Sequence, residues 1–244
     1  MEPLSPAVAG GILDPPNLIV VPVLFYSVDY SCCMGFALPK VYPILDASVF
    51  PAVGRVEFLD RLGRSMTDAG AGLMEYRNKT GTDAEVLADA RLLRTAMPLA
   101  KLVMDDRVDV AMAARFDGVH VDAGDLPPAD ARMLLGGAAI IGTSASCEAQ
   151  LQDALTSGAD YIAFGPVFPT TTKQTSVPPI GLEGVARFRA MAGAKPVLVA
   201  AAGITLDTAP AILEAGADVV AVSAAIFRAQ DPAEEFRRWM AVLG

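Results

Sequence analysis

The sequence has few of the residues from which the best-known hydrolase and zinc sites are built. It contains one histidine and three cysteines in 244 residues. No H-E-x-x-H and no G-x-S-x-G stretch occurs, so hydrolase chemistry of the familiar kinds has no candidate residues. Cys32 and Cys33 are adjacent and Cys147 is distant, which fits neither a disulfide framework nor a zinc site and is typical of a reducing cytoplasm.

Positive charge and long apolar runs are also scarce. The formal net charge of −9 argues against a nucleic-acid partner, because phosphate backbones are bound mostly by clustered lysine and arginine. The apolar run "LIVVPVLFY" (18–26) is too short to span a membrane, contains a proline and follows acidic rather than basic residues. We therefore expect a cytoplasmic protein with no membrane partner. Residues 1–40 are interpreted as a poorly ordered extension, or as a mis-assigned start before Met34.

From Val41 onward, short apolar runs alternate with longer stretches of helical composition. Strands are predicted near 41–45, 73–77, 101–104, 118–121, 139–143, 161–164, 196–200 and 219–223. Helices are predicted at about 55–69, 83–97, 107–115, 128–135, 148–157, 184–192, 207–215 and 232–242. The eight-fold alternation indicates one domain over residues 41–244.

Four joints between a predicted helix and the next strand share one form. They read "AGAGLMEY" (69–76), "RFDGVHV" (115–121), "SGADYIAF" (157–164) and "AGADVVAV" (215–222). Glycine at a helix C-terminus adopts positive φ without steric cost, and the apolar run after it is typical of a strand buried on both faces. This pattern predicts an α/β fold, a (β/α)₈ TIM barrel. An open doubly wound sheet is the alternative, but no G-x-G-x-x-G follows the first strand.

In such a barrel the chemistry is built where strands end and loops begin. Polar or small residues stand at each of these positions: Asp46, Arg77, Lys79, Asp105, Asp106, Asp122, Asp125, Ser144, the 165–182 loop, Gly203 and Ser223. Acidic residues on neighbouring loops are suited to Mg²⁺, although either member of the 105–106 pair could instead cap the helix beginning at Arg107.

Three further features bear on the site. Arg77 and Lys79 are two residues apart, so both side chains point the same way if the strand continues. The loop "FGPVFPTTTKQTSVPPIGLEG" (164–184) carries hydroxyls and a lysine that can donate to phosphate oxygens, which favours an anion-binding role over a passive connection. For His120, a packed or hydrogen-bonded role is favoured over that of a general base.

Several motifs together resemble the thiamine-phosphate synthase family, within the superfamily of TenI-like TIM barrels. They are "EYRNKT" (75–80), "DDRVDVAMA" (105–113), "DGVHVDAGDLP" (117–127), "IIGTSAS" (140–146), "FGPVFPTTTK" (164–173), "PPIGLEG" (178–184) and "AAGIT" (201–205). The resemblance covers roughly residues 41 to 228, and its most specific part is the G-P-V-F-P-T-x-T-K stretch.

The resemblance implies a transferase of thiamine biosynthesis. Such an enzyme joins 4-amino-5-hydroxymethyl-2-methylpyrimidine diphosphate to a thiazole phosphate and releases pyrophosphate. The implied partners are therefore small phosphorylated molecules, and a homo-oligomer is compatible with the sequence without being required by it.

The same resemblance implies which residues of this chain bind the two substrates and the metal ion. The pyrimidine diphosphate is held by Glu75, Tyr76, Arg77, Asn78, Lys79, Asp105, Ser144 and Lys173, of which Ser144 and Lys173 are also implied to act in catalysis. Mg²⁺ is held by Asp106 and Asp125. The thiazole phosphate is held by Thr170, Thr171, Thr172, Gly203, Ser223 and Ala224.

The chain departs from the family pattern at five places. Glu75 stands for a glutamine, Asp105 for an asparagine, "DAGD" (122–125) for G-Q-E-D and "AGI" (202–204) for G-G-I, and the last serine comes one position early at 223. Two alternatives therefore stay open. One is a thiazole tautomerase-like enzyme, disfavoured because that enzyme has a histidine where this chain has Ser146. The other is a non-catalytic protein that binds a phosphorylated ligand.

Overall fold

Eight parallel strands close into a barrel in the computed structural model, which describes residues 37–51, 53–170 and 177–244. In chain order they are β1 (Val41–Asp46), β2 (Leu73–Arg77), β3 (Lys101–Asp105), β4 (Gly118–Val121), β5 (Ile140–Ala145), β6 (Tyr161–Phe164), β7 (Val197–Ala201) and β8 (Val219–Val222). Each strand pairs with the next, and β1 pairs with β8. The predicted (β/α)₈ barrel is thus confirmed, and the open sheet is excluded.

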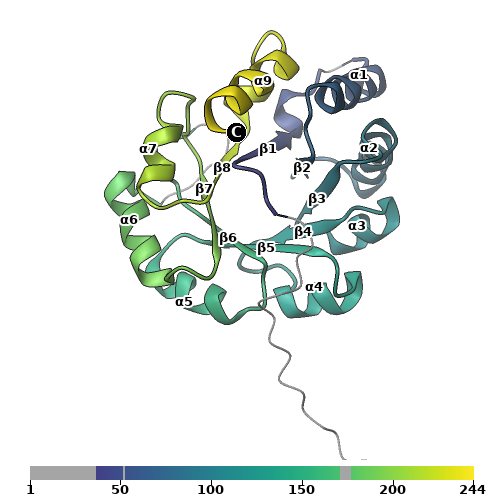
Figure 1. Cartoon of the computed structure of the whole chain (residues 1–244). Coiled ribbons are helices and arrows are strands. Elements are labelled where there is room, and N and C mark those ends of the chain that lie inside the picture. Colours follow the sequence, from purple (N-terminus) through teal and green to yellow (C-terminus); the bar gives the residue numbers. More distant parts are fainter. Residues whose placement is uncertain (1–36, 52, 171–176) are drawn as a thin grey trace, which may run out of the picture.

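Helices surround the barrel as an outer ring (Figure 1). They are α1 (Arg55–Asp68), α2 (Asp83–Ala96), α3 (Val108–Ala114), α4 (Pro128–Leu135), α5 (Glu148–Thr156), α6 (Gly181–Ala192), α7 (Ala209–Glu214) and α9 (Pro232–Leu243). Two short elements are not predicted from the sequence, a 3-10 turn η2 (Ala47–Val49) and the helix α8 (Ala224–Phe227). Both are shorter than the window over which hydrophobic periodicity can be recognised.

Local sequence explains where the helices begin and end. Thr82 and Glu85 form a capping box at the start of α2. Positive φ at Gly158 and Gly216 ends α5 and α7 as predicted. The joint at 115–121 differs, because there Arg115 takes the left-handed conformation (φ 56°). Gly118 instead lies within β4, where a Cβ atom would come 2.0 Å from the carbonyl oxygen of Ile140.

The strands divide the core into two layers, since successive side chains point to opposite faces. The inner layer fills the barrel and consists of Tyr42, Leu73, Val103, Ile140, Tyr161, Ala163, Val199, Val219 and Ala221. The other face of each strand packs against the helices in a larger cluster that includes Met74, Tyr76 and Trp239. A strand residue therefore faces either the barrel axis or the helices according to its parity.

Three arginine–aspartate pairs tie helices to the strand N-termini. Arg94 binds Asp117, Arg132 binds Asp160 and Arg189 binds Asp218. These aspartates also accept hydrogen bonds from the backbone N–H groups of β3, β5 and β7, respectively. Repeated contacts of this kind at the bottom of a barrel serve stability rather than chemistry.

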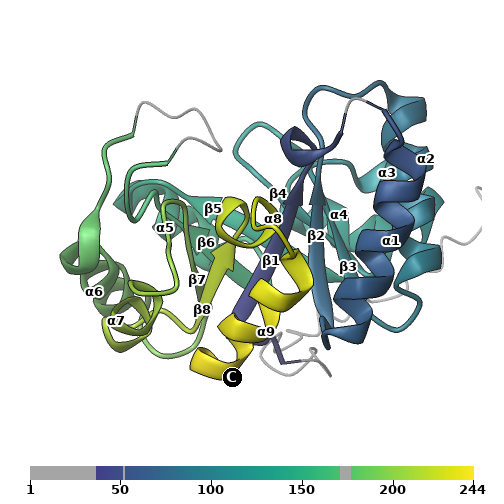
Figure 2. The ribbon, with the colours of Figure 1, turned by 90° about the horizontal axis from the view of Figure 1, so that it is seen from above.

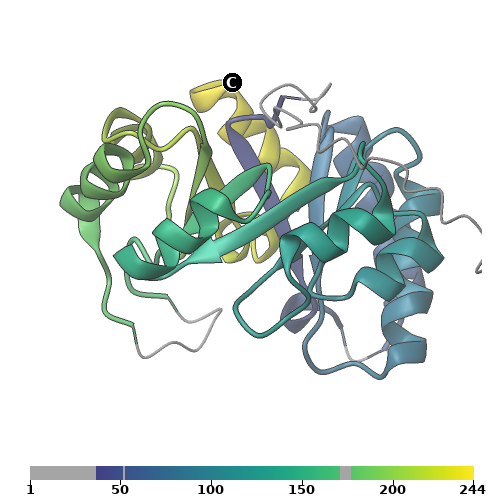
Figure 3. The same cartoon turned by 90° about the horizontal axis from the view of Figure 1, so that it is seen from below.

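The loops that follow the strands gather at the end of the barrel away from the C-terminus (Figures 2 and 3). Of the predicted extension 1–40, residues 1–36 lie outside the described part. Lys40 accepts a hydrogen bond from the backbone N–H of Val220, so the barrel's first contact lies just before β1. In the described ranges, no helix is long and apolar enough to cross a membrane.

Candidate active site

A cavity of about 370 Å³ opens at the end of the barrel where the strands finish. All eight strands contribute to its wall: Tyr42, Ile44, Asp46, Glu75, Arg77, Asp105, His120, Ser144, Tyr161, Ala163, Val199, Ala201, Ala221 and Val222 lie on them. On each strand that contributes more than one of these residues they are two apart, except on β8, whose last two residues both line the cavity. The strand alternation therefore brings charged and aromatic side chains from distant parts of the chain into one space.

A continuous hydrogen-bonded chain forms the floor of this cavity. Tyr42 Oη donates to Glu75 Oε2 (3.0 Å) and is also hydrogen-bonded to Tyr161 Oη (3.0 Å). Tyr161 Oη contacts His120 Nδ1 (3.1 Å), and His120 Nε2 contacts Ser144 Oγ (2.8 Å). Gly142 makes room for the ring of Tyr161, because a Cβ atom there would lie 2.0 Å from it. The floor is thus a polar relay inside an apolar barrel.

Burial perturbs the titration of the two ionisable groups in this relay. Desolvation raises the pKa of Glu75 to about 7, although the nearby His120 favours the ionised carboxylate. Burial alone would lower the pKa of His120, but the carboxylates of Asp122 and Glu75 outweigh that effect and raise it. Near neutral pH, Glu75 can therefore either donate a hydrogen bond to a ligand as a carboxylic acid or accept one as a carboxylate.

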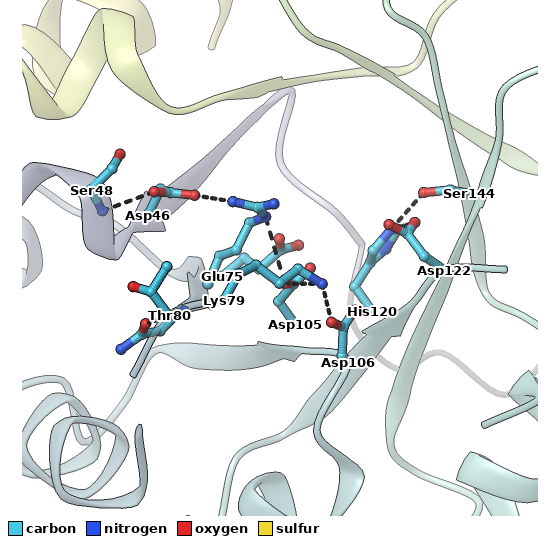
Figure 4. Close-up of polar contacts among 12 residues, drawn as sticks. Asp46, Ser48, Glu75, Lys79, Thr80, Asp105, Asp106, His120, Asp122 and Ser144 are labelled. Atoms are coloured by element: carbon cyan, nitrogen blue, oxygen red, sulfur yellow. Dashed lines mark hydrogen bonds and ion pairs between the residues drawn. The ribbon is translucent and has the colours of Figure 1, made fainter. Parts of the chain in front are cut away.

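Cations and carboxylates interleave at the rim of the cavity (Figure 4). Arg77 forms an ion pair with Asp46, and its Nε lies 3.6 Å from Asp105 Oδ2. Lys79 Nζ lies 3.0 Å from that same Asp105 oxygen and also pairs with Asp106. Both basic side chains thus contact Asp105, although the strand ends at Arg77 and does not continue to Lys79. Burial raises the pKa of Asp105, with Lys79 acting against it.

The two predicted metal ligands lie close together on neighbouring loops. Burial raises the pKa of Asp125, and a hydrogen bond with the Asp106 carboxyl group raises it further. Asp106 Oδ1 is buried and accepts no hydrogen bond among the described residues, and Asp106 has left-handed backbone (φ 63°). Two facing carboxylates with a free oxygen fit a hard divalent cation. In the described ranges, no group of three or more acidic, histidine or cysteine ligands forms a complete protein cage.

Neither Asp105 nor Asp106 caps the following helix. The residue at the N-cap position of α3 is Arg107, and no side chain caps it. The alternative structural role for these aspartates is therefore absent, and their carboxylates face Arg77 at the end of β2 and Lys79 in the loop after it.

The opposite side of the cavity offers backbone and hydroxyl groups. Gly203 and Ser223 line it together with Thr170 and the first residues of α8. Gly203 (φ 70°) has no room for a side chain, since a Cβ atom would lie 2.5 Å from the carbonyl oxygen of Phe168. Ser223 Oγ is buried without a hydrogen-bond partner in the described part of the chain. Such a wall can accommodate an anion without a charged side chain.

Of the predicted residues that the structure describes, five do not line the cavity: Tyr76, Asn78, Lys79, Asp106 and Asp125. Lys79, Asp106 and Asp125 lie beside it, where Lys79 contacts Asp105 and Asp106, and Asp106 contacts Asp125. The side chains of Tyr76 and Asn78 do not line it, because they point to the outer face of β2. Thr171, Thr172 and Lys173 lie outside the described residues. Tyr42 and Tyr161 were not predicted as site residues from the sequence, although each stands two residues from another cavity residue on its strand. Strand parity was the signal that could have identified both.

Comparisons with known proteins agree on one family. The sequence profile described as thiamine monophosphate synthase matches residues 41–226. The thiamine-phosphate synthase of Koribacter versatilis is 38% identical over 210 residues, covering 86% of this chain and 98% of that protein. The enzyme of the same name from Agrobacterium fabrum is 40% identical over 195 residues, covering 78% and 89%.

Solved structures give the same result. Thiamine phosphate pyrophosphorylase from Pyrococcus furiosus superimposes with a TM-score of 0.69 at 33% identity, covering 84% of this chain and 97% of that one. A 3-hexulose-6-phosphate synthase, at 19% identity and a TM-score of 0.62, shares the fold alone. With a profile match across most of the barrel and relatives near 40% identity, the chain belongs to the thiamine monophosphate synthase family.

Proposed function

We propose that this protein is a thiamine-phosphate synthase. It joins 4-amino-5-hydroxymethyl-2-methylpyrimidine diphosphate to a thiazole phosphate, giving thiamine phosphate and pyrophosphate. The observation that carries the proposal is one cavity with two chemically different ends, in a member of this family. One end has cations and carboxylates suited to a metal-bound diphosphate. The other has a glycine turn and a serine hydroxyl with no hydrogen-bond partner among the described residues, which suits a phosphate monoester.

In this reaction the bond between the pyrimidine methylene carbon and the diphosphate oxygen breaks, and a bond from that carbon to the thiazole nitrogen forms. The electron pair leaves with pyrophosphate, and no proton has to be transferred. Catalysis then depends on orientation and on charge stabilisation. The absence of a histidine placed as a dedicated general base at the rim agrees with this requirement, because His120 is hydrogen-bonded within the floor.

The pyrimidine ring is proposed to lie on the polar floor. Glu75 and Ser144 can each donate and accept hydrogen bonds, which matches an aminopyrimidine that carries adjacent donor and acceptor groups. Arg77 and Lys79 are proposed to face the diphosphate, with Lys173 reaching it from the 165–182 loop. Asp105, which both rim cations contact, holds these two side chains at the edge of the cavity.

Mg²⁺ is the proposed cofactor, with Asp106 and Asp125 as its protein ligands. When bound, it would neutralise charge on the departing pyrophosphate. The buried Asp106 Oδ1, which has no hydrogen-bond partner in the described ranges, and the proximity of Asp106 to Asp125 support this assignment. The acidic rim supports it further, since a bare diphosphate would be repelled by Asp105, Asp106 and Asp125.

The thiazole phosphate is proposed to bind at Gly203, Ser223 and Ala224, with Thr170, Thr171 and Thr172 completing the site. Small phosphorylated molecules are thus the proposed substrates, and the cytoplasm the proposed location. The location is supported by the sparse cysteines, of which Cys147 is exposed and free within the part of the chain that the structure describes. No nucleic-acid partner is proposed for so acidic a chain.

Turnover of the synthetic substrate pair, followed as thiamine phosphate formed, tests the proposal. We expect Mg²⁺-dependent product. Binding of both substrates without product would instead identify a non-catalytic ligand-binding protein, an alternative that the extra carboxylates Glu75 and Asp105 keep open. Isomerisation of a thiazole phosphate without condensation would identify a tautomerase.

A further inference from the structure

The segment that carries Arg77 and Lys79 is anchored from outside the barrel. Because side chains of β2 alternate, Glu75 and Arg77 face the cavity while Tyr76 faces the helices. Just beyond the strand, Asn78 contacts Tyr76 on the outer side, and Lys79 contacts Asp105 and Asp106 at the rim. Tyr76 is fully buried there, and its ring stacks on Phe50 with parallel planes. The two sides of one strand therefore serve different purposes.

A second hydrogen-bonded chain runs along this outer face. Tyr76 Oη donates to Asp89 Oδ2 on α2 and accepts a hydrogen bond from Asn78 Nδ2 (3.0 Å). Asp89 is itself buried, and its charge is compensated by the guanidinium of Arg55 on α1, with Nε to Oδ1 at 2.9 Å. Burial and the neighbouring Asp89 raise the pKa of Tyr76, so its hydroxyl remains a donor.

Asn78 connects this chain to the backbone that follows β2. Its Oδ1 accepts hydrogen bonds from the N–H groups of Gly81 (2.8 Å) and Thr80 (3.2 Å). The loop is folded tightly around this amide, since a Cβ atom on Gly81 would lie 2.6 Å from Asn78 Nδ2. Lys79 lies between Asn78 and this turn, so the backbone on both sides of the lysine is fixed.

We propose that Tyr76, Asn78 and Asp89 are positioning residues that hold Arg77 and Lys79 at the diphosphate end of the cavity. This inference rests on the proposed function of that end, and it replaces direct substrate contact as the role of the Tyr76 and Asn78 side chains. The Tyr76 hydroxyl is the only group in the described residues that joins the helix-borne ion pair to the Asn78 amide.

The physical reason for such an anchor is geometric. Arg77 and Lys79 already contact Asp46, Asp105 and Asp106, so their charges alone would allow several pairings. A displacement of about 1 Å at groups facing a leaving group can cost about a hundredfold in rate. Fixing the backbone at Asn78 selects one arrangement of the two cations before the diphosphate binds.

Tyr76→Phe tests the proposal, because it removes the hydroxyl and keeps the ring on Phe50. We expect the KM for the pyrimidine diphosphate to rise about tenfold, and the affinity for inorganic pyrophosphate with Mg²⁺, measured by calorimetry, to fall by a similar factor. The KM for the thiazole phosphate should stay within about twofold. Gly81→Ala, which displaces the Asn78 amide from the other side, should give the same selective pattern.

Arg94→Gln is the matched control. Arg94 lies on the same helix as Asp89 and also pairs with an aspartate, the half-buried Asp117, but at the opposite end of the barrel. Arg94→Gln should lower the melting temperature without raising the KM for the pyrimidine diphosphate relative to the KM for the thiazole phosphate. If Tyr76→Phe matches the wild type in pyrophosphate affinity, or raises both KM values equally, the positioning role is wrong. If the wild type binds no pyrophosphate and forms no product, the proposed function fails and the positioning proposal fails with it.

Discussion

Tyr42 donates a 3.0 Å hydrogen bond to Glu75 Oε2 at the floor of the cavity, where both side chains are buried. Tyr42 and Glu75 lie on adjacent strands β1 and β2, and the same tyrosine hydroxyl contacts Tyr161 across the barrel. One hydrogen bond does not replace the hydration that an isolated carboxylate loses on burial. The charge state of Glu75 therefore couples protein stability to pH.

Glu75→Gln should remove that coupling. The pKa of Glu75 rises from its ordinary 4.5 to about 7 on folding, so the folded state binds more protons than the unfolded state between these values. Stability from this group is thus full below pH 4.5 and is lost as pH rises to 7. A tenfold change in proton affinity is worth about 1.4 kcal/mol, so the loss is on the order of 3 kcal/mol. Urea unfolding at pH 5 and pH 7.5 measures it, and an equal pH response of both proteins would contradict the assignment.

Asp125→Asn should remove the magnesium-dependent turnover. The variant removes one of two facing carboxylates but keeps the side-chain shape and the capacity to accept the hydrogen bond from the Asp122 backbone N–H. We expect product formation to fall by at least about a hundredfold, equivalent to about 3 kcal/mol of transition-state stabilisation. Asp130→Asn, on helix α4, provides an acidic control on a neighbouring element. Full wild-type activity in EDTA would exclude Mg²⁺ as the cofactor.

Lys173→Ala should act on kcat. The charge of this lysine matters most as pyrophosphate departs, so its loss should lower kcat by about a hundredfold or more, on the order of 3 kcal/mol. Lys195, the lysine between α6 and β7, is the control position for removing one positive charge elsewhere. A loop that only links two elements would tolerate Lys173→Ala with no kinetic change.

Ser223→Ala should act mainly on the KM for the thiazole phosphate. The buried Ser223 hydroxyl faces the cavity without a partner among the described atoms, and a phosphate would supply one. That phosphate does not react, so the hydrogen bond contributes nearly equally in the ground and transition states. We expect a rise in KM of about tenfold with kcat nearly unchanged. A drop in kcat alone would show that this hydroxyl acts on the reacting atoms instead.

Adjacent substitutions at 202 and 203 should have opposite effects on stability. Ala202 has left-handed backbone (φ 72°), which costs a non-glycine residue about 1–2 kcal/mol. Ala202→Gly removes that strain, and after the entropy cost of glycine we expect a gain of about 0.5–1 kcal/mol. Gly203→Ala adds the strain and a clash with the Phe168 carbonyl, so we expect a loss of about 2 kcal/mol or more. Thermal unfolding decides both, and a stabilised Gly203→Ala would contradict this account.

Periodicity along the chain is sufficient by itself to predict the barrel. Buried parallel strands read as short apolar runs, and helix ends carry glycine, so both signals are local and survive in a single sequence. The same periodicity places Arg77 and Lys79 on one side, and it identifies Asp105 and Asp106 at a strand end. Parity on β2 also separates Tyr76 from Glu75, since neighbouring strand residues must face opposite ways.

Only the closed barrel decided which of these residues meet. Tyr42 and Tyr161 are 119 residues apart and touch because strands β1 and β6 face each other across the axis. How the helices dock on the sheet likewise decides that Asp89 on α2 meets Tyr76 on β2. It also decides the arginine–aspartate pairs at the N-terminal ends of the strands. Local sequence fixes the direction in which each side chain points. The stagger and closure of the strands fix what it reaches, because those distances are set by all eight strands together.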